Sequence, residues 1–300
     1  MAHMHRPRTI RITIIALIVV PVFVLAGLTP VAAVAPVGLG TADNFAVLAG
    51  STITNTGPTT ITGDVGLHPA GGGSPTGFAS VTLNGTLHDA DTVALNAKTD
   101  LVTAYNTAAG SLPVTTVATE LGAQTLPAGV YDSASGTFEI TGTLTLDAQG
   151  DPNAVFIFQM ETSLTTATSS VVRVINAGQA CNVFWQVGSS ATLGTSTTFI
   201  GNILALTSIT LVTSTTVEGR LLARNGAVTM DTNTITRAIC AQVTPPTTTT
   251  TLPVGPVATG GGSTGGVEDL GLLLVGGALL VGAVGVLGLR RRVERKGASS

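Results

Sequence analysis

The sequence predicts a mainly β fold, a right-handed three-sided β-solenoid with one long α-helix packed along it. Three observations lead to this prediction. A pattern of about 18 residues is written three times between Asn182 and Thr236, and repeats of this kind are typical of stacked structural units. The 300-residue chain contains 37 Gly but only 4% aromatic residues, which suits tight corners and a narrow core. Between its apolar ends, residues 89–110 show the clearest helical periodicity.

Each copy of the repeat contains an apolar strand, an alternating strand and a strand rich in hydroxyl groups. Stacking the copies at 182–198, 200–216 and 218–236 predicts two columns, the first of Thr195, Thr213 and Thr232, the second of Thr197, Thr215 and Thr234. Residues two apart in a strand point to the same side, so we expect one flat, exposed grid of methyl and hydroxyl groups. Alternatively, Thr is simply favoured in exposed strands. A neighbouring column of Thr192, Thr210 and Thr229 competes as the more exposed one.

The N-terminus is typical of a secretory signal peptide over residues 1–35. A basic stretch at 1–11 precedes an apolar stretch at 12–28, and Ala33-Val34-Ala35 provides a cleavage pattern of small residues. A retained membrane helix is the alternative. Cleavage would leave an exported domain at 36–243, long enough for one β domain with a continuous core.

Residues 89–110 predict the long helix of this domain. The apolar positions recur at spacings of three and four, which places them on one stripe; they are Ala90, Ala94, Ala97, Leu101, Tyr105 and Ala108. Asp89 and Asp91 suit the positive end of a helix, and Gly110 with Pro113 suits its end. The strands at 154–160 and 183–187 are its expected partners, because burial on both faces removes the polar alternation of a strand.

Cys181 and Cys240 are the two cysteines of the chain. An even number in an exported protein favours a disulfide. Three stacked coils would separate them by about 10–14 Å at the usual strand spacing, which is beyond disulfide reach. A break in the stacking order or a returning tail would bring them together, so the pairing stays open at this point.

We predict no catalytic, metal or cofactor site. Asp64 and His68 lie four residues apart, but Gly and Pro flank them, and loop hydrogen bonding is a commoner role than metal binding. Asp147 and Asp151 could form a pair of glycosidase carboxylates, yet both lie among turn-forming residues. A polysaccharide-active enzyme would need acids or bases clustered on one face.

The C-terminal region predicts a stalk and a membrane anchor. Residues 244–268 form a Pro/Thr/Gly-rich linker. Residues 269–289 are long and apolar enough to cross a bilayer, and the basic tail at 290–300 belongs on the cytoplasmic side. The expected location is therefore the cell surface or cell envelope, with a C-terminal transmembrane helix as the anchor.

Several long segments occur in the order found in a known family; they are 44–69, 126–131, 141–160, 181–194, 201–211 and 219–236. On these segments the chain closely resembles the widespread bacterial and fungal ice-binding protein family, over about Leu39 to Cys240. The resemblance implies a discontinuous β-solenoid flanked by one helix, without enzymatic activity.

The resemblance also implies which residues contact ice. Similar members carry a repeated Thr-(Ala/Gly)-x-(Thr/Asn) motif on the ice-facing side. The tetrads that match best here begin at Thr195 and Thr213, and looser ones begin at Thr168 and Thr232. The predicted ice-binding residues are Thr168, Ser170, Thr195, Thr197, Thr198, Thr213, Thr215, Thr216, Thr232 and Thr234.

The predicted function is therefore that of a surface-tethered ice-binding protein, which inhibits ice growth or recrystallisation or adheres to ice. Its expected partners are an ice crystal surface and, through the C-terminal helix, a membrane. We expect a monomer. A net charge of −3 with 10% charged residues leaves no basic stripe outside the termini, so nucleic acid is not an expected partner. The alternative is a cell-surface adhesin or structural module on the same scaffold that does not bind ice.

Overall fold

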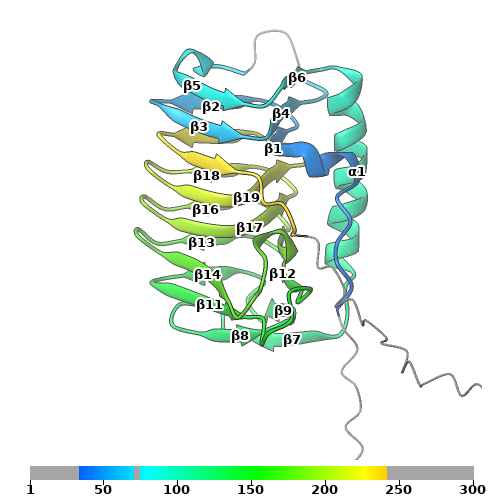
Figure 1. The fold of residues 1–300 in the computed structure, drawn as a ribbon, viewed down its shortest axis with the longest axis vertical. Helices are drawn as coiled ribbons and strands as arrows, with labels where there is room; N and C mark the ends of the chain where they lie inside the picture. The colour runs from blue at the N-terminus through cyan, green and yellow to red at the C-terminus, as the bar shows by residue number, and fades with distance from the viewer. Residues whose placement is uncertain (1–33, 71–74, 242–300) are drawn as a thin grey trace, which may run out of the picture. The chain divides into compact units, whose positions relative to one another are not determined.

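The computed structural model describes residues 34–70 and 75–241, which wind into a stack of parallel coils with one helix along its side (Figure 1). Residues 1–33 of the predicted signal peptide, the linker at 244–268, the transmembrane segment at 269–289 and the tail at 290–300 lie outside the described residues. Within the described ranges, no helix is both long and apolar enough to cross a membrane.

In Figure 1 the described chain first runs up beside the helix and then forms the coils at the upper end of the stack, which lead into the helix. These elements are η1 (Gly40–Asn44), β1 (Phe45–Ala49), β2 (Ile53–Thr56), β3 (Thr59–Thr62), β4 (Asp64–Leu67), η2 (Phe78–Ser80), β5 (Val81–Asn84), β6 (Leu87–Asp89) and α1 (Thr92–Ala109).

After the helix has run down the stack, the chain climbs back through further coils. The lower strands are β7 (Val114–Val117), β8 (Thr125–Pro127), β9 (Gly129–Ser133), β10 (Phe138–Ile140), β11 (Thr143–Asp147), β12 (Phe156–Met160), β13 (Leu164–Thr166) and β14 (Val171–Ile175). The upper ones, after η3 (Ala180–Asn182), are β15 (Val183–Val187), β16 (Ala191–Leu193), β17 (Thr198–Ala205), β18 (Ile209–Leu211), β19 (Thr216–Ala223), β20 (Val228–Asp231) and β21 (Thr234–Thr236).

The stacking order is discontinuous, because the first coil lies directly on the last one. β1 pairs with β19, β2 with β20 and β3 with β21, all in parallel. Residues near the N-terminus therefore complete a core that also contains residues about 175 positions later in the sequence, as in the pair of buried residues Ile53 and Val228. The mainly β architecture with one flanking helix is confirmed.

Three faces arise because β17 and β19 each run through a corner. Their first halves pair with β14 or β21, while their second halves pair with β15 or β1. The corner is at Gly201 (φ 117°) and Gly219. A Cβ on Gly219 would lie 1.8 Å from the carbonyl oxygen of Gly201, so only glycine allows the two coils to approach at this point.

The interior of the stack is filled by apolar side chains, with a column of aromatic rings in its middle. The Phe158 and Trp185 rings stack with centroids 4.1 Å apart, and Phe199 follows at 5.2 Å from Trp185. The Trp185 indole donates a hydrogen bond to the Ile200 carbonyl (3.0 Å). Such close packing makes the coils stiff.

A second apolar core lies between the helix and the strands it covers. Its members include Ala97, Leu101 and Ala104 from α1 and Phe184, Leu204 and Leu222 from β15, β17 and β19. The predicted partner strands β12 and β15 are confirmed, since both contact α1. Small alanine side chains let the helix approach the sheet closely.

The helix is two to three residues shorter at its N-terminus than predicted. Asp91 is the N-cap and accepts a hydrogen bond from the Ala94 amide (2.8 Å), which also lowers the pKa of the Asp91 carboxyl. Ala90 precedes the cap with a left-handed backbone (φ 52°) and is exposed. The remaining predicted stripe is buried as expected.

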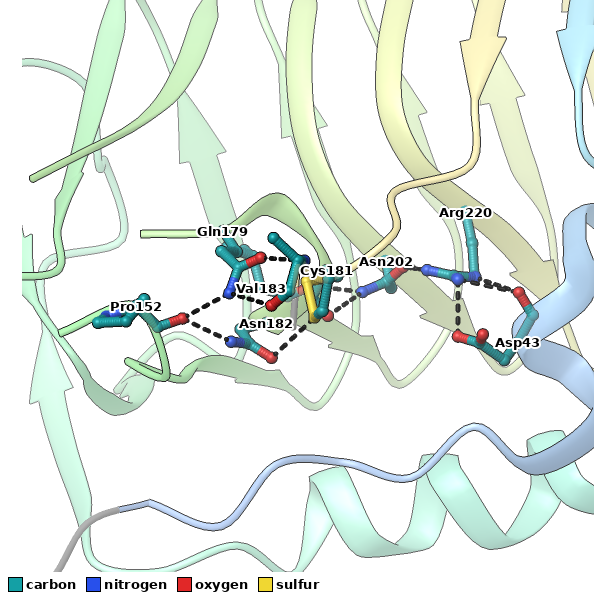
Figure 2. The surroundings of a disulfide bond; sticks show 10 residues. Asp43, Pro152, Gln179, Cys181, Asn182, Val183, Asn202 and Arg220 are labelled. Carbon is teal, nitrogen blue, oxygen red and sulfur yellow. Dashed lines mark hydrogen bonds and ion pairs between the residues drawn. A yellow bond between two sulfur atoms is a disulfide. The ribbon is translucent and has the colours of Figure 1, made fainter. Parts of the chain in front are cut away.

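The predicted disulfide between Cys181 and Cys240 is present, with Cα atoms 5.5 Å apart. After β21 the chain returns along the stack toward η3 (Figure 2), which removes the geometric objection raised by three stacked coils. The Gln179 side chain accepts a hydrogen bond from the Ala241 amide beside the disulfide. The last described residues are therefore fixed to the middle of the stack.

Candidate binding surface

The six-stranded sheet carries an unbroken column of threonines on its outer side. The sheet has the order β10-β13-β16-β18-β20-β2. Its outward residues pair in register from coil to coil; they are Glu139, Thr165, Thr192, Thr210, Thr229 and Thr54. We call the outer surface made by the five threonines the threonine face.

The threonine face has a closely packed, mainly apolar backing, in which Thr166 and Asn55 are the polar exceptions. On either side of each threonine, the side chains point inward and are buried, for example Ile209 and Leu211 around Thr210. Parallel pairing places successive threonines about 4.7–4.9 Å apart. Within the described ranges, the hydroxyls of Thr165, Thr192 and Thr210 have no protein hydrogen-bond partner, so they are free to bind water.

At one edge of this face the chain turns a corner, and the predicted grid divides there. Thr168, Thr195 and Thr213 lie just before the turn and are exposed or half-buried. The next residue in each coil has a left-handed backbone; these residues are Ser169, Ser196, Ser214 and, in the last coil, Thr232, with φ between 56° and 64°.

Ser170, Thr197 and Thr215 follow the turn and are completely buried. The prediction that they belong to an exposed grid is therefore wrong. A left-handed residue between two threonines breaks the strand alternation, so positions two apart no longer share a surface. The three hydroxyls instead donate to backbone carbonyls; Thr215 Oγ1, for example, donates to Gly194 O (3.0 Å).

Thr198, Thr216 and Thr234 are exposed but lie on a different face. They pair in register on β17, β19 and β21, continued by Thr60 on β3. We call this outer surface the adjacent face. Beside its threonines runs a second outward column that contains Arg173, Ile200 and Glu218. Long and charged side chains thus interrupt this face.

The predicted alignment of the third copy is shifted by one residue past the corner. Thr216 pairs with Thr234 at a separation of 18 residues, whereas Ile209 pairs with Val228 at a separation of 19. Asn233 therefore occupies the position of Thr215, and Thr232 is equivalent to the left-handed Ser214. The Thr232 side chain is half-buried and donates to Asp231 Oδ1 (3.0 Å).

The acidic residues considered as candidates have local structural roles. Asp147 accepts hydrogen bonds from the Gln149 amide (2.8 Å) and from Asn176 Nδ2 (2.7 Å), and both lower its pKa, the Asn176 bond most. Asp151 accepts from the Asn153 amide (2.8 Å) and Asp64 from the Thr86 amide (2.8 Å). Within the described ranges, no three His, Cys, Asp or Glu side chains gather as metal ligands would.

A family described as Ice-binding-like matches residues 47–236, more than half of the chain. The chain belongs to the ice-binding-like family. Two relatives named ice-binding protein are similar over most of this region. The protein of Nostoc sp. (strain HG1) is 50% identical over 202 residues, which are 67% of this chain and 74% of the relative. That of Flavobacterium frigoris (strain PS1) is 36% identical over 216 residues, 67% and 76% of the two chains.

Solved structures of the ice-binding-like family have the same fold. An ice-binding protein from an Antarctic biological consortium superposes with a TM-score of 0.66 at 48% identity, and the match covers 68% of this chain and 92% of that one. One from the Antarctic ascomycete Antarctomyces psychrotrophicus gives 0.65 at 39% identity, covering 68% and 100%. The match fills nearly all of both solved chains, so each of those chains consists almost entirely of this domain.

None of the five threonines of the threonine face is among the predicted ice-binding residues. The sequence offered Thr192, Thr210 and Thr229 only as a competing column, and it missed Thr165 and Thr54 altogether. Thr54 lies far from the repeat in sequence and joins the column only because the first coil stacks on the last. Thr165 lies 27 residues before Thr192, so the 18-residue period does not reach it. One sequence pattern could have identified both residues, namely a threonine between two inward-facing residues in a short strand.

Proposed function

We propose that this chain binds ice through the threonine face. The observation that carries the proposal is the unbroken, in-register column of five threonines, Thr165, Thr192, Thr210, Thr229 and Thr54, on a rigidly packed sheet. The adjacent face also has a threonine column, but Arg173 and Glu218 interrupt its surroundings. Of the two, the threonine face is the more regular surface.

The chemistry of threonine suits ordered water. Each side chain offers a methyl group, which is weakly hydrated, and a hydroxyl group, which can join a regular hydrogen-bonded layer. A single contact of this kind contributes little. A rigid array loses little conformational entropy on binding, so many weak contacts add up. Thr168, Thr195 and Thr213 lie at the corner beside this array, and the Thr213 hydroxyl donates to Asp231.

The proposal includes export and tethering. Residues 1–35 are proposed as a signal peptide, and residues 244–300 as a stalk, a transmembrane anchor and a cytoplasmic tail, on their sequence alone. The domain would act as a monomer at the cell surface, where bound protein would stop ice from growing or hold the cell to ice. No cofactor or catalytic step is needed.

The test is a pair of matched substitutions in the domain at 36–243. Thr210→Tyr places a bulky ring in the middle of the threonine face, whereas Thr216→Tyr does the same on the adjacent face. We expect Thr210→Tyr to abolish inhibition of ice recrystallisation and Thr216→Tyr to leave it nearly unchanged. Both positions point outward, so the unfolding midpoint should stay close to that of the wild type.

The opposite pattern would move the ice-binding surface to the adjacent face. If the unsubstituted domain does not inhibit recrystallisation at all, the scaffold serves as an adhesin or structural module instead.

A further inference from the structure

The buried polar residues at the corner form a continuous hydrogen-bonded column along the stack. We call Ser170, Thr197, Thr215 and Asn233 the corner column; each is at most 2% exposed. Each donates to a carbonyl of the preceding coil: Ser170 Oγ to Ile140 O (2.7 Å), Thr197 Oγ1 to Ala167 O (3.3 Å), Thr215 Oγ1 to Gly194 O (3.0 Å) and Asn233 Nδ2 to Val212 O (2.9 Å). The backbone N–H of Asn233 donates to Thr59 Oγ1 (3.1 Å), which connects the corner column to the next coil.

The acceptors of these bonds lie where the strands of the threonine face end. Ile140 is the last residue of β10, and Ala167, Gly194 and Val212 directly follow β13, β16 and β18. Thr192 and Thr210 are only two residues before Gly194 and Val212. The corner column therefore fixes the backbone next to the exposed threonines, one coil after another.

The corner needs such fixation, because its backbone is unfavourable. Each member of the corner column directly follows a non-glycine residue with a left-handed backbone. Residues of this kind keep a left-handed conformation only where the surrounding structure enforces it. The buried donors of the corner column hold this backbone in place from inside the stack.

We propose that the corner column positions the threonine face for ice. By holding the ends of β10, β13, β16 and β18 at the same height and turn angle, it keeps the threonines of successive coils in one plane. This inference rests on the proposed function. It assigns a positioning role in ice binding to side chains that never reach the surface.

The test removes hydroxyl donors without changing side-chain shape. In Thr197→Val/Thr215→Val both residues stay β-branched and lose only the hydroxyl. Gly194 O still accepts from the Thr197 amide (3.2 Å), so the domain at 36–243 should remain folded near 0 °C, as checked by circular dichroism. We expect the variant to need at least about ten times more protein for equal inhibition of recrystallisation. Fluorescently labelled variant should also cover fewer planes of a single ice crystal.

Two matched variants separate positioning from stability. Thr215→Ser keeps the donor and should stay within about twofold of the wild type. Ile203→Val removes a buried methyl group from the core on β17, lowers the unfolding midpoint and should leave both ice measurements unchanged. Double-variant activity within twofold of the wild type would overturn the proposal, as would an equal loss in Ile203→Val. If the double variant does not fold, the single variants Thr197→Val and Thr215→Val decide the matter by the same criteria.

Thr210→Tyr distinguishes failure of this inference from failure of the proposed function. If Thr210→Tyr abolishes inhibition of recrystallisation and the corner-column variants retain it, the threonine face is supported as the ice-binding surface and the positioning role is refuted. If Thr210→Tyr retains inhibition of recrystallisation, the threonine face is not the ice-binding surface, and both proposals are refuted.

Discussion

Thr232 has a backbone conformation that a β-branched residue rarely adopts, with φ at 56°. Its equivalents in the preceding coils are serines, and the equivalent in the next coil is Gly57. A left-handed conformation costs an L-residue roughly 1–2 kcal/mol, whereas glycine adopts it freely. The hydroxyl of Thr232 offsets part of this cost by its bond to Asp231.

Thr232→Gly should therefore stabilise the domain. We expect the free energy of unfolding to rise by about 0.5–1 kcal/mol, since relief of the backbone strain exceeds the extra entropy of glycine in the unfolded chain. Urea denaturation measures the change. Ser214→Val, which creates a β-branched residue at the equivalent site, should be destabilising. A loss of stability in Thr232→Gly would mean that its hydrogen bond outweighs the strain.

Individual threonines also show what could not be predicted from the sequence. The hydroxyl-rich columns were visible, but the buried or exposed state of each threonine was not. Thr197 and Thr198 are adjacent and chemically identical, yet one donates inside the corner and the other lies on the adjacent face. Adjacent residues of a strand point to opposite sides, and the left-handed Ser196 decides that Thr197 is the one that points inward. Serine gives little indication of such a conformation.

At the scale of elements, the helix is joined to the stack by a buried lysine. Lys98 is 8% exposed and donates to the carbonyls of Ala223 and Arg224 at the end of β19. Burial, and to a lesser degree the Arg224 charge, lowers the pKa of Lys98 to about 8. Arg224 in turn lies over the Tyr105 ring of the same helix, 4.7 Å from its centroid.

The lowered pKa of Lys98 makes the stability of the domain depend on pH. Between pH 8 and about 10.5, the unfolded state binds more protons at this site than the native state, so stability rises with pH. The gain is at most roughly 3 kcal/mol, and less because the two carbonyls favour the ammonium form. Denaturant unfolding at pH 7.5 and pH 10 should show it, and Lys98→Met should remove the difference. An equal pH dependence in Lys98→Met would assign it to other groups.

Element types were largely predictable, while their junctions were not. The alanine stripe and Asp91 identified the helix, and the continuous apolar runs identified the strands beneath it. The sequence placed the boundaries between copies near residues 199 and 217. β17 and β19 instead continue through those positions and bend at Gly201 and Gly219, where the coils approach too closely for a side chain.

At the scale of the whole molecule, the disulfide fastens the end of the described chain to the start of β15. The two cysteines are 59 residues apart. In the chain-entropy model a loop of this length stabilises the native state by about 4 kcal/mol. Cys181→Ser/Cys240→Ser should lower the free energy of unfolding by roughly that amount, measured in urea without reductant.

The disulfide joins η3 to the segment after β21 and involves no strand of the threonine face, so the effect should be confined to stability. Inhibition of recrystallisation near 0 °C should be unchanged while the domain stays folded. Addition of a reductant to the wild type should reproduce the loss of stability. A loss of ice activity in the folded double variant would show that the returning tail also shapes the binding surface.

The first coil lying on the last has a consequence for biogenesis. A nascent chain has made β1, β2 and β3 long before it has made the strands that lie beneath them, so these coils keep an open edge throughout synthesis. Unpaired strand edges invite aggregation, and contacts between distant residues form slowly. Release from the ribosome before residue 236 has emerged would leave the edge of the N-terminal coils unpaired, and a partner that shields this edge would have its greatest effect at that stage.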